Sequence, residues 1–203
     1  MGMSRDWAAY YRKTGQRPPR ATLLFALDRF DAEPAMSGPR LAVDLGSGSG
    51  RDVVEMLRRG WRVLAIDAET SAIEQMRERE ELADNASLET KVTRFEDADW
   101  PPADLVNSSF ALPLCPPDRF PDLWARIVDS LKPGGRFSGQ LYGPRDSWAD
   151  RDGMTIVDRP VLDALLKGLE VEMLDEEEDD STTPRGEAKH WHVFHIVARK
   201  PDG

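Results

Sequence analysis

Cysteine and long apolar runs are almost absent from this chain of 203 residues. Cys115 is the only cysteine, which excludes an intramolecular disulfide framework and a cysteine-cluster metal site and favours a reducing cytoplasm. No stretch approaches the roughly 18 apolar residues that a membrane span needs, and residues 1–13 contain no apolar signal-peptide core. The sequence therefore predicts a soluble, cytoplasmic protein without a membrane partner.

Histidine is also scarce, with three residues, and the 27 basic residues are outnumbered by 37 acidic ones. The formal net charge is −10, so a nucleic-acid partner is not expected, because neutralising phosphates requires Lys and Arg gathered on one face. Residues 170–180 hold eight acids and no base, a pattern typical of a solvated loop. Strand alternation would direct His190 and His192 to one face and His195 to the other. No metal site is therefore expected.

The chain does contain a regular alternation of strand and helix patterns. Strands are expected at residues 40–45, 61–67, 91–95 and 103–110 and after a turn at 132–135, and helices at 51–59, 71–82, 118–131 and 161–169. Ser71 and Glu74 have the spacing of a capping box. Such an alternation requires right-handed crossovers and a mostly parallel sheet with helices on both faces. The predicted fold class is α/β, with an open, doubly wound sheet.

Both ends of the chain depart from this alternation. Residues 4–13 and 18–30 are helix candidates before the first strand, and we expect residues 1–37 to form a lid over a core of residues 38–203. At the other end, residues 169–178 and 189–200 are strand candidates with no helix between them, so they must pair antiparallel. No repeat or linker divides the chain, which predicts a single domain.

Three glycines at alternate positions, Gly46, Gly48 and Gly50, lie between the first strand and the following helix. Without β-carbons, this corner allows a ligand to approach the main chain, and the N–H groups of the helix face that ligand. Arg51 stands where a dinucleotide fingerprint has its third glycine, which disfavours a nicotinamide-dependent reductase. Asp67 ends the neighbouring strand, where a carboxylate accepts from ribose hydroxyls. The pattern predicts a nucleoside site.

These motifs resemble those of the class I S-adenosylmethionine-dependent methyltransferases. The first family motif, an acid followed by Gly-x-Gly-x-Gly, matches Asp44, Gly46, Gly48 and Gly50. The remaining motifs follow in order, at Asp67 with Ala68, at Glu96 or Asp97 for the adenine, at Asn107 in the fourth-strand segment, and at the turn 131–135. The resemblance implies a seven-stranded Rossmann-like sheet, S-adenosylmethionine as the cofactor, and these residues as its binding site.

A narrower resemblance rests on single segments. Residues 50–52 and 60–67 are similar to the small TehB-like and thiopurine-type group of the family. Residues 107–110, Asn-Ser-Ser-Phe, stand where amide and adenine N-methyltransferases carry Asn/Asp-Pro-Pro-Tyr/Phe, and the prolines are missing. This difference argues against methylation of a nucleobase or of glutamine.

The methyl acceptor is expected outside the carboxyl ends of the parallel strands. The last strand begins at that edge, close to the end of the fifth strand, which makes Tyr142, Arg145 and His190 the candidate catalytic residues. Surface pairing of Arg145 with Asp146 or Asp150 is the alternative for that residue. Aromatic walls are expected from Trp148 and Trp191, and from Trp7, Tyr10 and Tyr11 of the lid.

Since a sulfonium methyl group is already activated, transfer requires mainly an in-line approach in a shielded site. The resemblance therefore implies an enzyme that methylates a small-molecule acceptor. A non-catalytic nucleoside-binding module is one alternative. Methylation of a protein or an RNA is another, although the sequence contains no basic region that would bind RNA.

Overall fold

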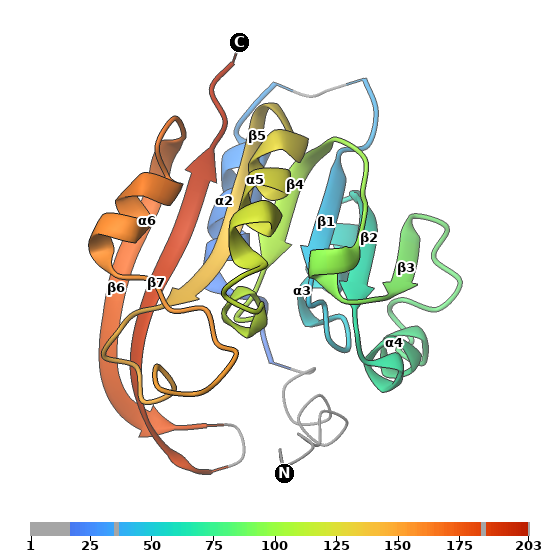
Figure 1. Ribbon diagram of the computed structural model, residues 1–203. Coiled ribbons are helices and arrows are strands. Elements are labelled where there is room, and N and C mark those ends of the chain that lie inside the picture. Colours follow the sequence, from blue (N-terminus) through green and yellow to red (C-terminus); the bar gives the residue numbers. More distant parts are fainter. Residues whose placement is uncertain (1–16, 35–36, 184–185, 203) are drawn as a thin grey trace.

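The computed structural model describes residues 17–34, 37–183 and 186–202 (Figure 1). The predicted helix at residues 4–13, with Trp7, Tyr10 and Tyr11, lies outside the described residues. The second predicted helix is present as α2, Ala21–Asp31. The division into a lid and a core stays a prediction.

Seven strands form one sheet in the order β3-β2-β1-β4-β5-β7-β6. Their bounds are Leu41–Leu45 for β1, Arg62–Asp67 for β2, Leu88–Val92 for β3, Ala103–Ser108 for β4, Leu131–Tyr142 for β5, Glu170–Thr182 for β6 and Ala188–Arg199 for β7. Neighbouring strands from β3 to β5 are parallel, whereas β7 runs antiparallel to both β5 and β6. The predicted doubly wound sheet with a closing antiparallel pair is confirmed.

Helices cover both faces of the sheet because its central strands are apolar on both sides. Ala42 belongs to the core under α2, α3 and α4, and its neighbour Val43 belongs to the core under α5 and α6. Figure 1 shows α5 and α6 in front of the sheet and α2 behind it. The bounds are Arg51–Arg58 for α3, Thr70–Arg77 for α4, Phe120–Ser130 for α5 and Arg159–Leu165 for α6. No helix among the described residues is long and apolar enough to cross a membrane.

The predicted capping box at the start of α4 is wrong. Glu69, with an extended backbone, precedes the helix, and no side chain caps it. Ser71 already lies in the first turn, because the helix begins one residue before it. The helix also ends at Arg77, earlier than the predicted residue 82.

The third strand lies three residues earlier than its predicted position at residues 91–95. β3 ends at Val92, and a 3₁₀ turn, Phe95–Asp97, follows it. The chain leaves the sheet at this point because Phe95 packs into the core under α5. The apolar residue that suggested a strand therefore anchors a turn.

The acidic run at residues 170–180 lies in a strand, which confirms the strand predicted at residues 169–178 and contradicts the solvated loop predicted from the charges. It forms most of β6, which pairs with β7 from Glu170 opposite Arg199 to Thr182 opposite Ala188. The repulsion between the acids is relieved because Arg and His side chains pair with Glu170, Glu172, Glu176, Glu177, Glu178 and Asp180. Charges on an edge strand also disfavour pairing with another chain.

The β6–β7 hairpin extends past the carboxyl end of β5. The β5–β7 ladder ends at Tyr142 opposite Val193, whereas β7 begins at Ala188. The segment after β5 lies against this extension, where the Ser147 N–H donates to the His190 carbonyl oxygen at 3.0 Å. The hairpin therefore borders the edge of the sheet at which β4 and β5 end (Figure 1).

Candidate functional site

The corner between β1 and α3 is built from three glycines in the left-handed region. The φ angles of Gly46, Gly48 and Gly50 are +73°, +54° and +82°, which residues with a side chain rarely adopt. A β-carbon on Gly46 would lie 2.2 Å from the Ala111 Cβ atom, and one on Gly50 would lie 2.8 Å from Met76 Cγ. Packing within the protein therefore requires two of these glycines, which refines the prediction that they serve ligand access.

Hydrogen bonds hold this turn against the end of β2. Two N–H groups of the turn donate to the Ile66 carbonyl oxygen at 2.8 and 3.1 Å. Asp67 accepts from the Gly48 N–H at 2.8 Å through Oδ2 and from the Glu69 N–H at 2.9 Å through Oδ1. Asp67 is 4% exposed, whereas Ala68 is exposed. The carboxylate predicted to face a ribose thus lies beside the glycine turn.

Ser47, between the first two glycines, is buried, and its hydroxyl has no hydrogen-bond partner in the part of the chain that the structure describes. Leaving such a group unpaired costs about 1–3 kcal/mol. A polar ligand against the turn would supply the missing partner. The donors, the carboxylate and this hydroxyl together fit a nucleoside with an amino-acid tail.

A row of polar side chains crosses the sheet next to this turn. Asp44 on β1 stands opposite Asn107 on β4, and Asn107 stands opposite Ser138 on β5. The Ser138 hydroxyl donates to Asn107 Oδ1 at 2.6 Å. The Asn107 Nδ2 group then donates to Asp44 Oδ1 at 2.8 Å and to Oδ2 of Asp52, on α3, at 3.2 Å. One amide group thus holds two buried carboxylates from different elements.

The electrostatics of this row favour a cation. Burial raises the pKa of the Asp44 carboxyl well above its usual range, and the Asp52 and Asp67 carboxylates raise it further, against the opposing hydrogen bond from Asn107. Within the described ranges, no Lys, Arg or His forms an ion pair with Asp44 or Asp52. The described residues also contain no group of three or more metal-ligating side chains suited to a metal ion.

The two acids that follow β3 differ in their surroundings. Glu96 is 4% exposed, and its carboxylate accepts from Arg94 Nε at 2.5 Å. The Asp97 side chain is 49% exposed and pairs with Arg119 at 2.7 Å. The structure therefore separates a buried acid from a surface acid, an alternative that the sequence leaves open.

Phe110, Tyr142, Trp148 and Trp191 form an aromatic cluster at the carboxyl edge of the sheet. Ring centroids within it lie 6.0–6.2 Å apart, in tilted and edge-to-face arrangements. Phe110 comes shortly after β4 with a φ of +58°, and Gln140 Oε1 accepts its N–H at 3.0 Å. This contact brings the cluster to the end of the strand that carries the polar row.

A buried ion pair between Lys189 and Asp146 lies behind the cluster, and both side chains are 0% exposed. The Lys189 Nζ atom lies 4.2, 4.3 and 4.9 Å from the ring centroids of Trp148, Trp191 and Tyr142. Burial lowers the pKa of Lys189, whereas Asp146 acts in the opposite direction. The ammonium group thus contacts the faces of three aromatic rings, and its ion pair with Asp146 connects β7 to the segment after β5.

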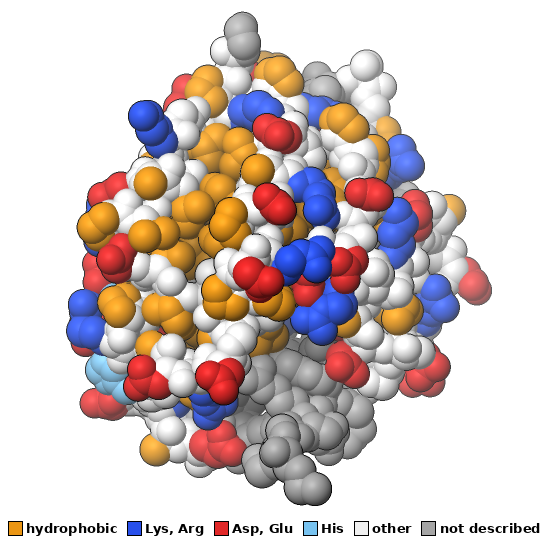
Figure 2. Space-filling model, in the orientation of Figure 1, with side chains coloured by type: hydrophobic (Ala, Val, Ile, Leu, Met, Phe, Trp, Pro, Cys, Tyr) orange, Lys and Arg blue, Asp and Glu red, His pale blue; other side chains and the backbone are white. Residues whose placement is uncertain are grey.

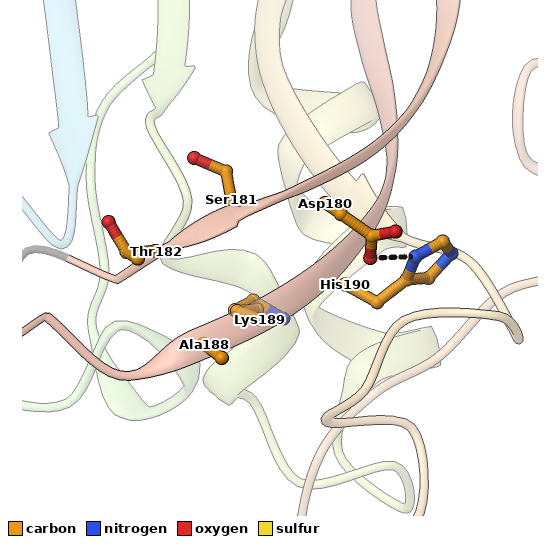
Figure 3. A pocket seen from close by; sticks show the side chains of 6 residues that line it. All are labelled: Asp180, Ser181, Thr182, Ala188, Lys189 and His190. Carbon is orange, nitrogen blue, oxygen red and sulfur yellow. Dashed lines mark hydrogen bonds and ion pairs between the residues drawn. The ribbon is translucent and has the colours of Figure 1, made fainter.

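Of the three candidate catalytic residues, only Tyr142 lies in the aromatic cluster. Arg145 pairs with Glu176 and Glu178 of β6, and not with Asp146 or Asp150. Strand alternation directs His190 to the face opposite Lys189 and Trp191. Figure 3 shows it directed toward Asp180, beside a hollow of about 530 Å³ at the hairpin tip. Arg145 and His190 thus form ion pairs with acids of the β6–β7 hairpin and not with residues of the polar row.

Four residues of the polar row and the aromatic region could not be identified as site residues from the sequence pattern. Asp52 is an acid in the first turn of α3, a common place for an acid. Gln140, Asp146 and Lys189 lie in separate segments, and only the β5–β7 pairing and the loop between β5 and α6 bring them near the cluster. The sequence pattern alone therefore cannot distinguish them from ordinary polar residues.

Comparison with known proteins places this geometry in a family. Residues 42–135 match the family model of a methyltransferase domain. A comparison with curated protein sequences gives no significant match.

Three solved structures share the fold. TehB from Haemophilus influenzae has a TM-score of 0.73 at 17% identity, over 94% of this chain and 65% of that chain. The second is the 1,6-didemethyltoxoflavin-N1-methyltransferase from Burkholderia thailandensis, with bound 1,6-didemethyltoxoflavin and S-adenosylhomocysteine. It has a TM-score of 0.65 at 21% identity, and the match covers 98% of this chain and 82% of that chain. The N-methyltransferase NodS from Bradyrhizobium japonicum WM9, in complex with S-adenosylhomocysteine, has a TM-score of 0.66 at 14% identity, over 96% and 88%.

The strand order and the glycine turn define a doubly wound α/β protein, a class in which ligands bind at the carboxyl edge of the sheet. The match of residues 42–135, from β1 to the start of β5, identifies a class I S-adenosylmethionine-dependent methyltransferase domain, and the solved structures share the fold of the chain. S-adenosylmethionine is its cofactor and methyl donor. The predictions of the family, the fold and the cofactor are confirmed.

Proposed function

We propose that this methyltransferase acts on a small-molecule acceptor held against the aromatic cluster. The single observation that carries the proposal is the position of Phe110, which joins that cluster to the strand bearing Asn107. Such a wall of rings binds apolar or planar molecules of metabolite size. On the face shown in Figure 2, basic and acidic side chains are interspersed, unlike the gathered basic charge of an RNA-binding surface.

The glycine turn and its neighbours form the proposed cofactor site. Asp67 accepts from the ribose hydroxyls, the turn faces the amino-acid tail, and the exposed Ala68 borders the adenine. Glu96 is the proposed acid on the adenine side, since it is buried at the end of the adjacent segment, whereas Asp97 is held at the surface by Arg119. Asp44 and Asn107 support the turn from below.

The cofactor supplies an activated methyl group, and this chain supplies position and shielding. Phe110 and Tyr142 orient the acceptor beside the end of β4, and Gln140 fixes Phe110 by its hydrogen bond to the main chain. Holding the acceptor in line and excluding water accounts for much of the acceleration that methyl transfer requires. Tyr142, which is 3% exposed, is the one of the three candidate catalytic residues that lies in the aromatic cluster.

Incubation with S-adenosylmethionine labelled in its methyl group and a cell extract tests the proposal. We expect the label to enter the low-molecular-mass fraction, with Asp67→Ala reducing the incorporation. Tyr142→Phe and Tyr142→Ala distinguish the ring from its hydroxyl group, since only the alanine variant removes the wall. Label in protein or RNA alone would contradict a small-molecule acceptor, and cofactor binding without any transfer would indicate a non-catalytic module.

A further inference from the structure

Phe110 has a backbone conformation that residues with a side chain rarely adopt. Its φ angle is +58°, and among the described residues other than glycine only Asp84 also has a positive φ. Such strained positions persist only where the surrounding structure holds them, and they are frequent at catalytic and ligand-binding sites. The contacts that hold Phe110 therefore bear on the use of its ring.

The turn that carries Phe110 lies between the glycine turn and the aromatic cluster. The next residue, Ala111, packs so closely against the glycine turn that its Cβ atom leaves no room for a side chain at Gly46. The Phe110 ring itself lies 6.2 Å from the ring of Tyr142 and 6.0 Å from that of Trp191, measured between centroids. A displacement of this turn therefore changes the spacing between the two sides of the proposed site.

The amide group of Gln140 holds this turn, and its orientation is determined by its two partners. Gln140 is 1% exposed, and its Oε1 atom accepts from the Phe110 main-chain N–H at 3.0 Å. Because a main-chain N–H can only donate, the Nε2 group points the other way. There it donates to the Thr22 hydroxyl at 2.8 Å, and Thr22 is also 1% exposed. The Thr22 hydroxyl therefore helps to fix the amide that holds Phe110.

Thr22 is in turn fixed by the helix that carries it. It lies in the first turn of α2, whose apolar residues pack in the core behind the sheet. Directly before the helix, the Arg20 main-chain N–H donates to Oδ1 of Asp52 on α3 at 3.1 Å. The Arg20 guanidinium lies 4.2 Å from the Phe110 ring centroid. The start of α2 thus contacts both the helix after the glycine turn and the turn that carries Phe110.

We infer that Thr22 is a positioning residue for methyl transfer, which acts through Gln140 to hold Phe110 at a set distance from the glycine turn. The inference rests on the proposed function, and it adds a residue of α2 that belongs neither to the proposed cofactor site nor to the aromatic cluster. Binding of the cofactor does not depend on the Thr22 hydroxyl. The rate of transfer does, because a displaced ring leaves the acceptor out of line with the methyl group.

Methyl-labelled S-adenosylmethionine, with the low-molecular-mass fraction of a cell extract as the source of acceptor, tests the inference. Valine keeps the shape of threonine without its hydroxyl, whereas serine keeps the hydroxyl. We expect Thr22→Val to lower the maximal rate of label transfer about 10- to 100-fold, with an unchanged KM for S-adenosylmethionine. Thr22→Ser should retain a rate near that of the wild type. Gln140→Met should lower the rate as well, and it provides the same test if circular dichroism shows that Thr22→Val does not fold.

Ser130→Ala is the matched control for the loss of a hydroxyl acceptor. The Ser130 hydroxyl accepts from the side-chain N–H of Trp100 at 2.8 Å, at the opposite end of β5 from Gln140. The variant therefore loses a comparable hydrogen bond away from the proposed site. Its maximal rate should equal that of the wild type, which separates positioning from a general loss of stability.

Hydrogen exchange of the Phe110 amide, followed by NMR without any acceptor, provides an independent measurement. Exchange should be fastest in Gln140→Met, intermediate in Thr22→Val, and slowest in the wild type and Thr22→Ser. If Thr22→Val equals the wild type in its maximal rate or in this exchange, the inference is overturned and the proposed function stands. If the wild type transfers no label, the proposed function itself is overturned.

Discussion

At the scale of single residues, Gly46 occupies a position where a β-carbon has no room. Its φ of +73° and the 2.2 Å approach to Ala111 act together, whereas Gly60, with a φ of +80°, has nothing within 4 Å. We expect Gly60→Ala to cost about 1–2 kcal/mol, the cost of the left-handed backbone. Gly46→Ala should cost a further 1–3 kcal/mol or so, because overpacking adds to it. Equal losses in urea unfolding would contradict this account.

Asp44 gives a second prediction for a single residue. Its folded pKa is raised above the unfolded value, so the folded state binds more protons, and the free energy of unfolding falls as the pH rises from the unfolded pKa through the folded one. In Asp44→Asn the side chain does not ionise, so this decrease in the free energy of unfolding does not occur. We expect the ligand-free variant to be more stable than the wild type at neutral pH, with the difference vanishing in acid.

Urea unfolding at several pH values measures this difference. Asp175→Asn, at an exposed position of β6, serves as the control and should not change the pH dependence. A variant that is less stable than the wild type at neutral pH would show that Asp44 is ionised and stabilising without the cofactor.

Cys115 gives a third prediction. Burial, with a smaller effect of Glu96, raises the pKa of its thiol to about 12, and the side chain is 0% exposed. A buried thiol that stays protonated does not react as a nucleophile. We expect iodoacetamide to leave the folded protein unmodified and to alkylate Cys115 fully in urea, as measured by mass spectrometry. Rapid alkylation of the folded protein would contradict the closed packing around this residue.

At the scale of elements, the Lys189–Asp146 pair joins β7 to the segment between β5 and α6. Lys189→Met leaves a buried carboxylate unpaired, and we expect a loss of about 3–5 kcal/mol of unfolding free energy. Arg159→Met is the matched control, because Arg159 and Asp163 form an exposed pair worth about 0–1 kcal/mol. The double variant with Asp146→Leu should recover part of the loss, and failure to recover any would point to lost packing alone.

The elements also show which structural signals are local in the sequence. The strands β1, β2 and β4 were predictable because each is a short apolar run next to a glycine, an acid or a polar residue at the sheet edge. The strand β6 was predicted over residues 169–178, but its acidic run was also expected to form a solvated loop, since the Arg and His side chains that compensate its charges, such as Arg145 and Arg136, are distant in the sequence. The start of α4 depended on the backbone at Glu69, which side-chain spacing does not reveal.

At the scale of the whole molecule, the arrangement of residues on the proposed cofactor side of the site was predictable, and the arrangement on the proposed acceptor side was only partly so. Asp44, the glycines and Asp67 lie in consecutive elements whose adjacency follows from the doubly wound order. The aromatic cluster draws on Phe110, Tyr142, Trp148 and Trp191, which meet through the β5–β7 pairing and a long loop. Trp148 and Trp191 could be predicted as aromatic walls near Tyr142, whereas Phe110 could not, because its place in the cluster depends on the turn after β4, where its φ is +58°.

The central claim is that the turn between β1 and α3, with Asp67, holds the cofactor. Titration of the wild type, Asp67→Ala and the surface variant Asp175→Ala with S-adenosylhomocysteine tests it most directly. We predict saturable binding at one site in the wild type and in Asp175→Ala. In Asp67→Ala, binding should weaken about 10- to 100-fold, as expected when hydrogen bonds to a charged group are lost. Equal affinity in Asp67→Ala and the wild type, or no binding to the wild type, would contradict the account.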